Sequence, residues 1–237
     1  MKFFLVVGTF VVFSSCNIIN GHMLTGNGNI RTEKRNTGNF RAVKTSGSID
    51  VEINSGNAYE VSVEDDDNLL PYVVTEVNNG TLNIHYENNT SINNDHAKVY
   101  VTVPSLDKLV ASGSADITIR DVLKNTQKFE LNVSGSGNIK GAVDAPAVSI
   151  GVSGSGNVDL KGRTKDFECS VSGSGDVDCG GLQSENATVK VTGSGNAHVF
   201  ASVNLSASIS GSGDVYYGGS PKTEIHSSGS GSVQPEK

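Results

Sequence analysis

One short string recurs through the second half of this chain and constrains its fold more than any other feature. The string is SGSGN or a close variant, and its start-to-start spacings are 22, 19, 19, 20, 18 and 18 residues. Spacings of this length are typical of repeat architectures, in which each unit packs only against its neighbours. The copies start at Ser112, Ser134, Ser153, Ser172, Thr192, Ser210 and Ser228, and related strings start at Thr25 and Ser46.

The residues that flank each copy predict strands. Phe129, Leu131 and Val133 precede one copy and alternate with polar residues, and Val158 and Leu160 follow the next copy in the same way. Period-two alternation is the mark of a strand with one buried face, whereas a flexible Gly/Ser linker would lack it. A single unit cannot cover its own apolar face, but units stacked about 4.8 Å apart form a continuous core. We therefore predict an all-β fold, a parallel β-solenoid with coils of about 19 residues.

An Asn or Asp residue ends each corner of the predicted coils. Both residue types tolerate the left-handed backbone region, and their side chains can bond local amide groups. We expect these residues to shape the corners, and we treat them as candidate site residues. They are Asp116, Asn138, Asn157, Asp176, Asn196 and Asp214.

The amino terminus has the features of a targeting segment. Lys2 precedes the apolar run of residues 3–13, which is too short to span a bilayer as a permanent helix. Ser14 and Ser15 stand directly before Cys16, as in a bacterial lipobox. We predict that residues 1–15 are a lipoprotein signal peptide and that Cys16 carries the lipid that anchors the chain to a membrane. An ordinary secretory signal cut nearby is the alternative.

The remaining boundaries follow from the repeat pattern. Residues 16–37 are predicted to be the lipidated N-terminus and a tether, residues 38–233 the β-solenoid, and residues 234–237 a tail. Within the solenoid, residues 38–104 are expected to form irregular coils and residues 105–233 regular ones. A separate β-subdomain at 38–104 is the alternative, and the segment 87–96 is predicted to be a polar loop.

Three further strings, together with the repeats, carry a resemblance to a known family. They are GNFRAVKTSGSIDVEI from Gly38, NLLPYVVTEVNNGTLNIHY from Asn68 and VTVPSLDKLVASGSADI from Val101. With them, the chain resembles the auto-transporter adhesin, head GIN domain family from about Gly38 to Val233. The resemblance implies a right-handed parallel β-helix related to the pectin-lyase-like architecture. It brings no set of catalytic residues.

The candidate chemistry along the chain is sparse. Consecutive carboxylates at 64–67 do not converge on one point, so we expect a solvated loop there rather than a calcium site. The five histidines lack ligand spacing, and Tyr216 and Tyr217 are expected to pack rather than to stack on a sugar. Cys169 and Cys179 fall on inward positions and form either a disulfide or two buried thiols. No metal and no cofactor are predicted.

These observations favour a binding or structural role. The net charge of −7 with scattered Lys and Arg argues against nucleic acid as a partner. We expect a non-catalytic, adhesin-like lipoprotein of the cell envelope, at the outer membrane, with an unknown glycan or protein ligand. The alternative is a carbohydrate-active or glycan-binding β-helix protein. Residues 17–21 lack an acidic cluster, so either face of the membrane is compatible with the sequence.

Overall fold

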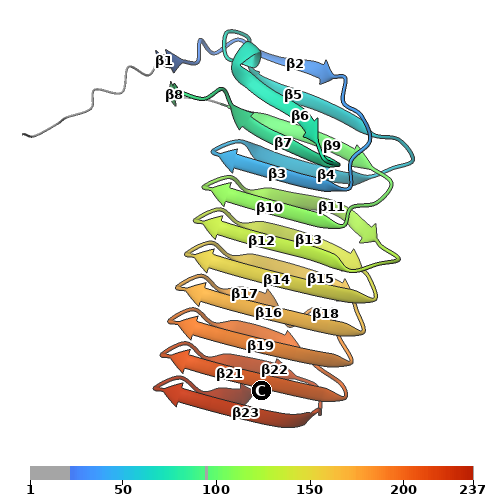
Figure 1. The fold of residues 1–237 in the computed structure, drawn as a ribbon, viewed down its shortest axis with the longest axis vertical. Helices are drawn as coiled ribbons and strands as arrows, with labels where there is room; N and C mark the ends of the chain where they lie inside the picture. The colour runs from blue at the N-terminus through green and yellow to red at the C-terminus, as the bar shows by residue number, and fades with distance from the viewer. Residues whose placement is uncertain (1–21, 94–95, 237) are drawn as a thin grey trace, which may run out of the picture.

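The computed structural model describes residues 22–93 and 96–236, and over these residues the chain is a right-handed parallel β-helix (Figure 1). The coils stack along the long axis of the molecule, with each regular coil contributing one strand to each of two sheets. The only helical element in this part of the chain is a short 3-10 helix, η1 (Leu70–Tyr72). The predicted fold class is therefore confirmed.

The first sheet has ten strands, and in sequence every second strand of the regular coils belongs to it. Its order in space is β6 (Val73–Asn78), β7 (Thr81–Tyr86), β3 (Ala42–Gly47), β10 (Lys108–Gly113), β12 (Phe129–Gly135), β14 (Ala147–Gly154), β16 (Asp166–Gly173), β19 (Asn186–Gly193), β21 (Asn204–Gly211) and β23 (Lys222–Gly229).

The second sheet has twelve strands and lies opposite the first. Its order is β2 (Ile30–Arg35), β5 (Glu60–Asp66), β9 (Lys98–Val103), β4 (Asp50–Ser55), β11 (Ile117–Lys124), β13 (Ile139–Asp144), β15 (Val158–Arg163), β17 (Val177–Cys179), β20 (Ala197–Phe200), β22 (Val215–Gly218) and β24 (Val233–Pro235), while β18 (Leu182–Gln183) also pairs with β15. A separate parallel pair joins β1 (His22–Thr25) to β8 (Thr90–Asn93).

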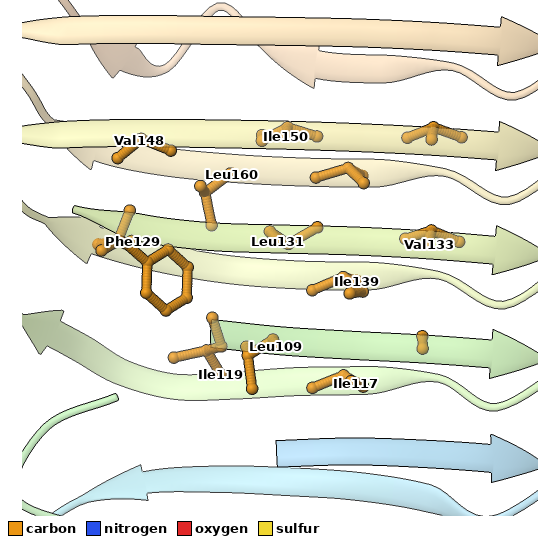
Figure 2. Packing of buried hydrophobic residues seen from close by; sticks show 14 of the residues in the cluster. Leu109, Ile117, Ile119, Phe129, Leu131, Val133, Ile139, Val148, Ile150 and Leu160 are labelled. Carbon is orange, nitrogen blue, oxygen red and sulfur yellow. The ribbon is translucent and has the colours of Figure 1, made fainter. Parts of the chain in front are cut away.

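Equivalent residues of successive coils are in register across the whole first sheet. Ile150 of β14 pairs with Leu131 of β12 on one side and with Cys169 of β16 on the other. Each inward column therefore consists of side chains stacked directly on one another, as Figure 2 shows for Leu109, Leu131 and Ile150. Every inward position that the alternation predicts on β12, β14, β16, β19 and β21 is buried, with an exposed fraction of 3% or less.

Glycines shape the corners for two different reasons. Gly173 has a φ of +128°, a region that residues with a Cβ rarely adopt. Gly175 has no positive φ, but a Cβ there would overlap the carbonyl oxygen of Gly156 one coil earlier. The corner is thus the place where the backbones of neighbouring coils come closest, which explains why the string SGSG recurs.

The N-terminal end is a cap that stacks out of sequence order. After β4 the chain turns back, and β7 and β9 pair in parallel with the outer sides of β3 and β4. The chain then returns, and β10 and β11 pair with the other sides of the same two strands. The first regular coil therefore lies between two coils that both follow it in sequence. The guanidinium of Arg41, just before β3, donates hydrogen bonds to the carboxylate of Asp107, just before β10. This ion pair links the start of the first coil to the segment that returns from the cap.

The predicted boundaries need correction at this end. Residues 38–104 continue both sheets, so they are not a separate subdomain. They are not simply looser coils either, because β5 pairs antiparallel with β2 and β9, and β6 pairs antiparallel with β7. Part of the predicted tether is also folded, because β2 pairs with β5 along its length. Alternation could not predict β2, since five of its six residues are exposed and it has no buried face.

The last coil is more polar than those it stacks on. Thr223 and Ser227 of β23 occupy columns that hold Leu205 and Ile209 one coil earlier, and all eight residues of β23 are exposed. A polar outermost coil is the usual way in which repeat proteins end a stack in solution. Val233–Pro235 pair with β22, so the predicted tail at 234–237 begins inside a strand.

We predict that the inward and outward columns differ sharply in their tolerance of charge. Val171→Asp places an unpaired carboxylate in a position that is 1% exposed and should cost about 3 kcal/mol or more. Ser170→Asp lies next to it on the outer face, between Gly151 and Lys190, and should change stability by no more than about 0.5 kcal/mol. Thermal and denaturant unfolding of both variants measures the difference. Equal losses would contradict the register.

Candidate functional site

The corner Asn and Asp residues line up into one continuous column along the stack. The spacings between them are 22, 19, 19, 20 and 18 residues, and Asp50 and Ser232 extend the column at its two ends. The side-chain Oδ1 of each residue accepts a hydrogen bond from the backbone N–H of the equivalent residue one coil later. The bond from Asp176 N–H to Asn157 Oδ1, for example, is 3.0 Å long.

An asparagine in this column makes a second bond that an aspartate cannot make. Asn157 Nδ2 donates to Asn138 Oδ1 at 3.0 Å, and Asn196 Nδ2 donates to Asp176 Oδ1 at 3.0 Å. Asp214 accepts both the N–H and the hydroxyl of Ser232, and these bonds, the hydroxyl first, lower the pKa of its carboxyl group. The column thus extends the hydrogen bonding between coils through the corner, where strand pairing is interrupted.

The role of these residues differs from the predicted one. Among the described residues, the non-glycine positions with positive φ are Asn79 and Asn89, so the corner Asn and Asp residues do not use the left-handed region. Their bonds also reach the next coil rather than local amides. The structure therefore brings all six predicted residues together as a structural column, and none of them lines the five main hollows on the described part of the chain.

The two inward cysteines are free thiols in this structure. Cys169 stacks on Ile150 and Cys179 stacks next to Val199 in its own sheet, and both are buried. Burial raises the pKa of the Cys169 thiol to about 12, and it also raises the pKa of Cys179 well above its ordinary value. The sequence left open a disulfide or two buried thiols, and the structure has two buried thiols.

The acidic run at 64–67 was predicted to be a solvated loop, and for two of its residues this is wrong. Asp65 and Asp66 are fully buried. Asp65 accepts bonds from the Tyr86 hydroxyl at 2.8 Å and from the His96 N–H at 3.2 Å. Asp66 accepts from Gly28 N–H and lies 2.9 Å from His96 Nδ1, and the bond to His96 is the main reason that its pKa is lowered.

This buried pair is a structural joint within the N-terminal cap. The two carboxylates connect β5 to the segments before β2 and β9. In the parts of the chain that the structure covers, no group of three or more His, Cys, Asp or Glu residues is placed to hold a metal ion. Sequence reasoning missed the joint because its partners, Gly28, Tyr86 and His96, are 21 to 38 residues away.

The predicted packing role of the tyrosines agrees with their surroundings. Tyr217 packs against the core. The ring of Tyr216 stacks on that of His198 at a centroid distance of 4.7 Å, on the outer face of the second sheet. His198 Nδ1 also lies 3.0 Å from a carboxylate oxygen of Glu236. These side chains cover one another, so they do not form an open platform for a sugar ring.

A polar groove runs across the outer face of the N-terminal cap. Its first part is a hollow of about 510 Å³ over β6, β7 and β3. Its second part, of about 650 Å³, lies between the corner Ser46–Ser48 and residues 85–92. The two parts share Ser46 and His85, so they are direct neighbours on this face, and we call them together the polar groove.

The groove is lined mainly by amides and hydroxyl groups. Five asparagines contribute to it, from β6, β7 and the two turns that follow these strands. Its charged side chains have both signs, with Lys44 opposed by Glu76 and Glu87. The asparagines are Asn78, Asn79, Asn83, Asn88 and Asn89.

The sequence did not predict this groove. Residues 87–96 were expected to be a polar loop, whereas Thr90–Asn93 form β8 and residues 87–92 line one wall. The asparagines are visible in the sequence, but their juxtaposition with Ser46 depends on the out-of-order stacking of the cap. Cys16, the predicted lipidation site, lies outside the described residues. Within those residues, no helix has the length and apolarity needed to cross a membrane.

A family model matches residues 39–221 of the chain, and its description is "Putative auto-transporter adhesin, head GIN domain". The chain belongs to this family. The match spans the first coil, the cap strands from β5 to β9 and the regular GIN-domain coils up to β22. A search of curated proteins finds no significant match.

Solved structures show the same architecture. A putative lipid binding protein from Parabacteroides distasonis ATCC 8503 is 28% identical with a TM-score of 0.77, over 91% of this chain and all of that one. A putative adhesin from the same strain is 27% identical with a TM-score of 0.74, over 90% of this chain and all of that one. A putative adhesin from Bacteroides fragilis NCTC 9343 is 18% identical, with a TM-score of 0.84 and the same coverages, and shows the fold alone.

We predict that the corner column distinguishes Asn from Asp. Asn157→Asp loses the bond to Asn138 and puts two carboxylates side by side, so stability at pH 7 should fall by about 0.5–1 kcal/mol. Asp176→Asn is the matched control, because it keeps its acceptor and gains a donor toward Asn157. If both changes were equally destabilising, the column would not contribute through these bonds.

We also predict that Cys169 and Cys179 are unreactive thiols in the folded protein. In a Cys16→Ala chain they are the remaining cysteines, and iodoacetamide at pH 8 should leave both unmodified, since the thiolate is the reactive form. After unfolding in guanidinium without reductant, both should react, and mass spectrometry counts the adducts. Unfolded protein that reacts only after reduction would show that the disulfide forms instead.

Proposed function

We propose that this GIN-domain chain is a lipid-anchored protein of the cell envelope, at the outer membrane, whose solenoid is a non-catalytic, adhesin-like binding head. The observation that carries the proposal is the filled interior of the coils. The buried residues form one continuous hydrophobic cluster from Phe40 to Val215. A ligand must therefore meet the outer surface, and a long rigid stack offers a large one.

The anchor rests on the sequence of the amino terminus. Residues 1–15 have the charge, apolar run and small residues of a lipoprotein signal, and Cys16 follows at the position that such signals modify. One acyl chain gives only marginal membrane binding, whereas the several chains of a lipoprotein anchor hold a protein stably. The proposed partners are thus the membrane, through the lipid, and a ligand on the head.

A glycan-binding role is the second candidate, and the polar groove favours it. An enzyme acting on glycans is less well supported. The groove carboxylates, Glu76 and Glu87, are both exposed to water, whereas a general acid needs an apolar setting to stay protonated at neutral pH. A lipid ligand, which the name of one structural neighbour invokes for that neighbour, would need an apolar cavity, and the lining of this groove is polar.

The anchor predicts a clear change in localisation. In cells that produce the full chain, Cys16→Ala should move the protein from the membrane fraction to the soluble exported fraction, because the lipid is its hold on the membrane. Cys169→Ala removes a cysteine from the core and should leave the protein in the membrane fraction. Immunoblots of the fractions measure both variants.

The binding role has its own readout in the same cells. Cells with the wild-type chain should adhere to a mucin-coated surface better than cells lacking it, and cells with Cys16→Ala should lose that gain. Full retention of Cys16→Ala in the membrane fraction would overturn the anchor. Adherence that is the same with and without the chain would overturn the adhesin-like role.

A further inference from the structure

We propose that the groove across the N-terminal cap is a binding site for a neutral oligosaccharide chain. This inference rests on the proposed binding function and names its site and its ligand class. The groove consists of two neighbouring hollows that share Ser46 and His85, and these two residues lie one position beyond Thr45 and Ile84, the last pair between β3 and β7. Its combined length crosses three strands and continues past the corner of the first coil.

The chemistry of the lining fits sugar hydroxyl groups. A hydroxyl group both donates and accepts hydrogen bonds, and so does the side chain of asparagine or serine. Asn83, in the middle of β7, lines the first hollow, and Asn88, which is exposed, lines the second. Lys44 is outnumbered by Glu76 and Glu87, so the groove has no excess of positive charge for a polyanion to bind.

The spacing of the lining groups also fits a chain of sugars. Adjacent strands lie about 4.8 Å apart, which is close to the length of one pyranose ring. Ser46 on β3, His85 on β7 and the residues of β6 therefore present polar groups to successive rings. β7, the strand at the centre of the groove, is paired on both sides and therefore offers no free backbone edge for strand addition by a peptide.

The floor of the groove is held in place before any ligand arrives. Leu82 and Ile84 of β7 are fully buried, so they fix the strand to the core while Thr81, Asn83 and His85 face outward. The turn between β6 and β7 is set by Asn79 and Gly80, which have φ values of 51° and 74°. A site that is already ordered loses little conformational entropy on binding.

The test uses the full chain carrying Cys16→Ala, which removes the lipid, in affinity gel electrophoresis. The gels contain neutral polysaccharides (mannan, xylan, amylose or galactan), with heparin and polygalacturonate as anionic comparisons. We expect at least one neutral polysaccharide to retard the protein. Ser46→Leu fills the junction of the two hollows and should weaken that binding at least tenfold, and Asn88→Ala should weaken it several-fold.

Two matched controls keep the test decisive. Ser172→Leu makes the same change in the same column of the sheet, several coils away, and Asn204→Ala removes an asparagine far from the groove. Both should bind like the parent, and all variants should melt at the parent temperature. Equal binding by Ser46→Leu and Ser172→Leu would overturn the groove while leaving an adhesin-like head. Retardation by none of the neutral polysaccharides, or only by the anionic ones, would overturn the ligand class.

Discussion

The in-register stacking of backbones at a spacing of about 4.8 Å is the constraint on which the rest of this structure depends. It forces every side chain to lie against its own equivalent one coil away, so the inward columns of β12 to β21 are apolar in every coil. At the corners it brings Gly175 so close to Gly156 that no side chain fits. It also places each corner carboxylate or amide within reach of the next N–H group, so that Asn157 can bond Asp176.

That regularity explains which features can be predicted from the sequence. Val133, Val152 and Val171 recur at the repeat spacing, and because the coils stack in register, their burial follows from alternation alone. The cap breaks both conditions. β2 has no buried face. β7 and β9 lie on one side of the first coil, whereas β10 and β11, which come next in the chain, lie on its other side. The groove and the buried Asp65–Asp66 joint both arise from this rearrangement, so local patterns carry no signal for them.

The corner residues illustrate a different limit. Their positions were predictable, since Asn and Asp favour tight turns. Their role was not, because the relevant partner of Asn138 is Asn157, and this contact exists only after the coils have stacked. The chain thus separates two kinds of polar residue that look alike in sequence. One kind, in the corner column, uses its side chain to accept a hydrogen bond from the next coil. The other, around Ser46 and Asn83 at the cap, faces an open groove.

With the proposed anchor at Cys16, the small parallel pair of β1 and β8 would give the cap a mechanical role. β8 continues directly from the wall of the groove, and Thr90–Asn93 are hydrogen-bonded to His22–Thr25, which follow the proposed anchor. A pulling force on a ligand bound in the groove would therefore be transmitted to the anchor through the β1–β8 pair and not through the stack of regular coils. The regular coils, including the exposed strand β23 at the far end, would then carry none of this force.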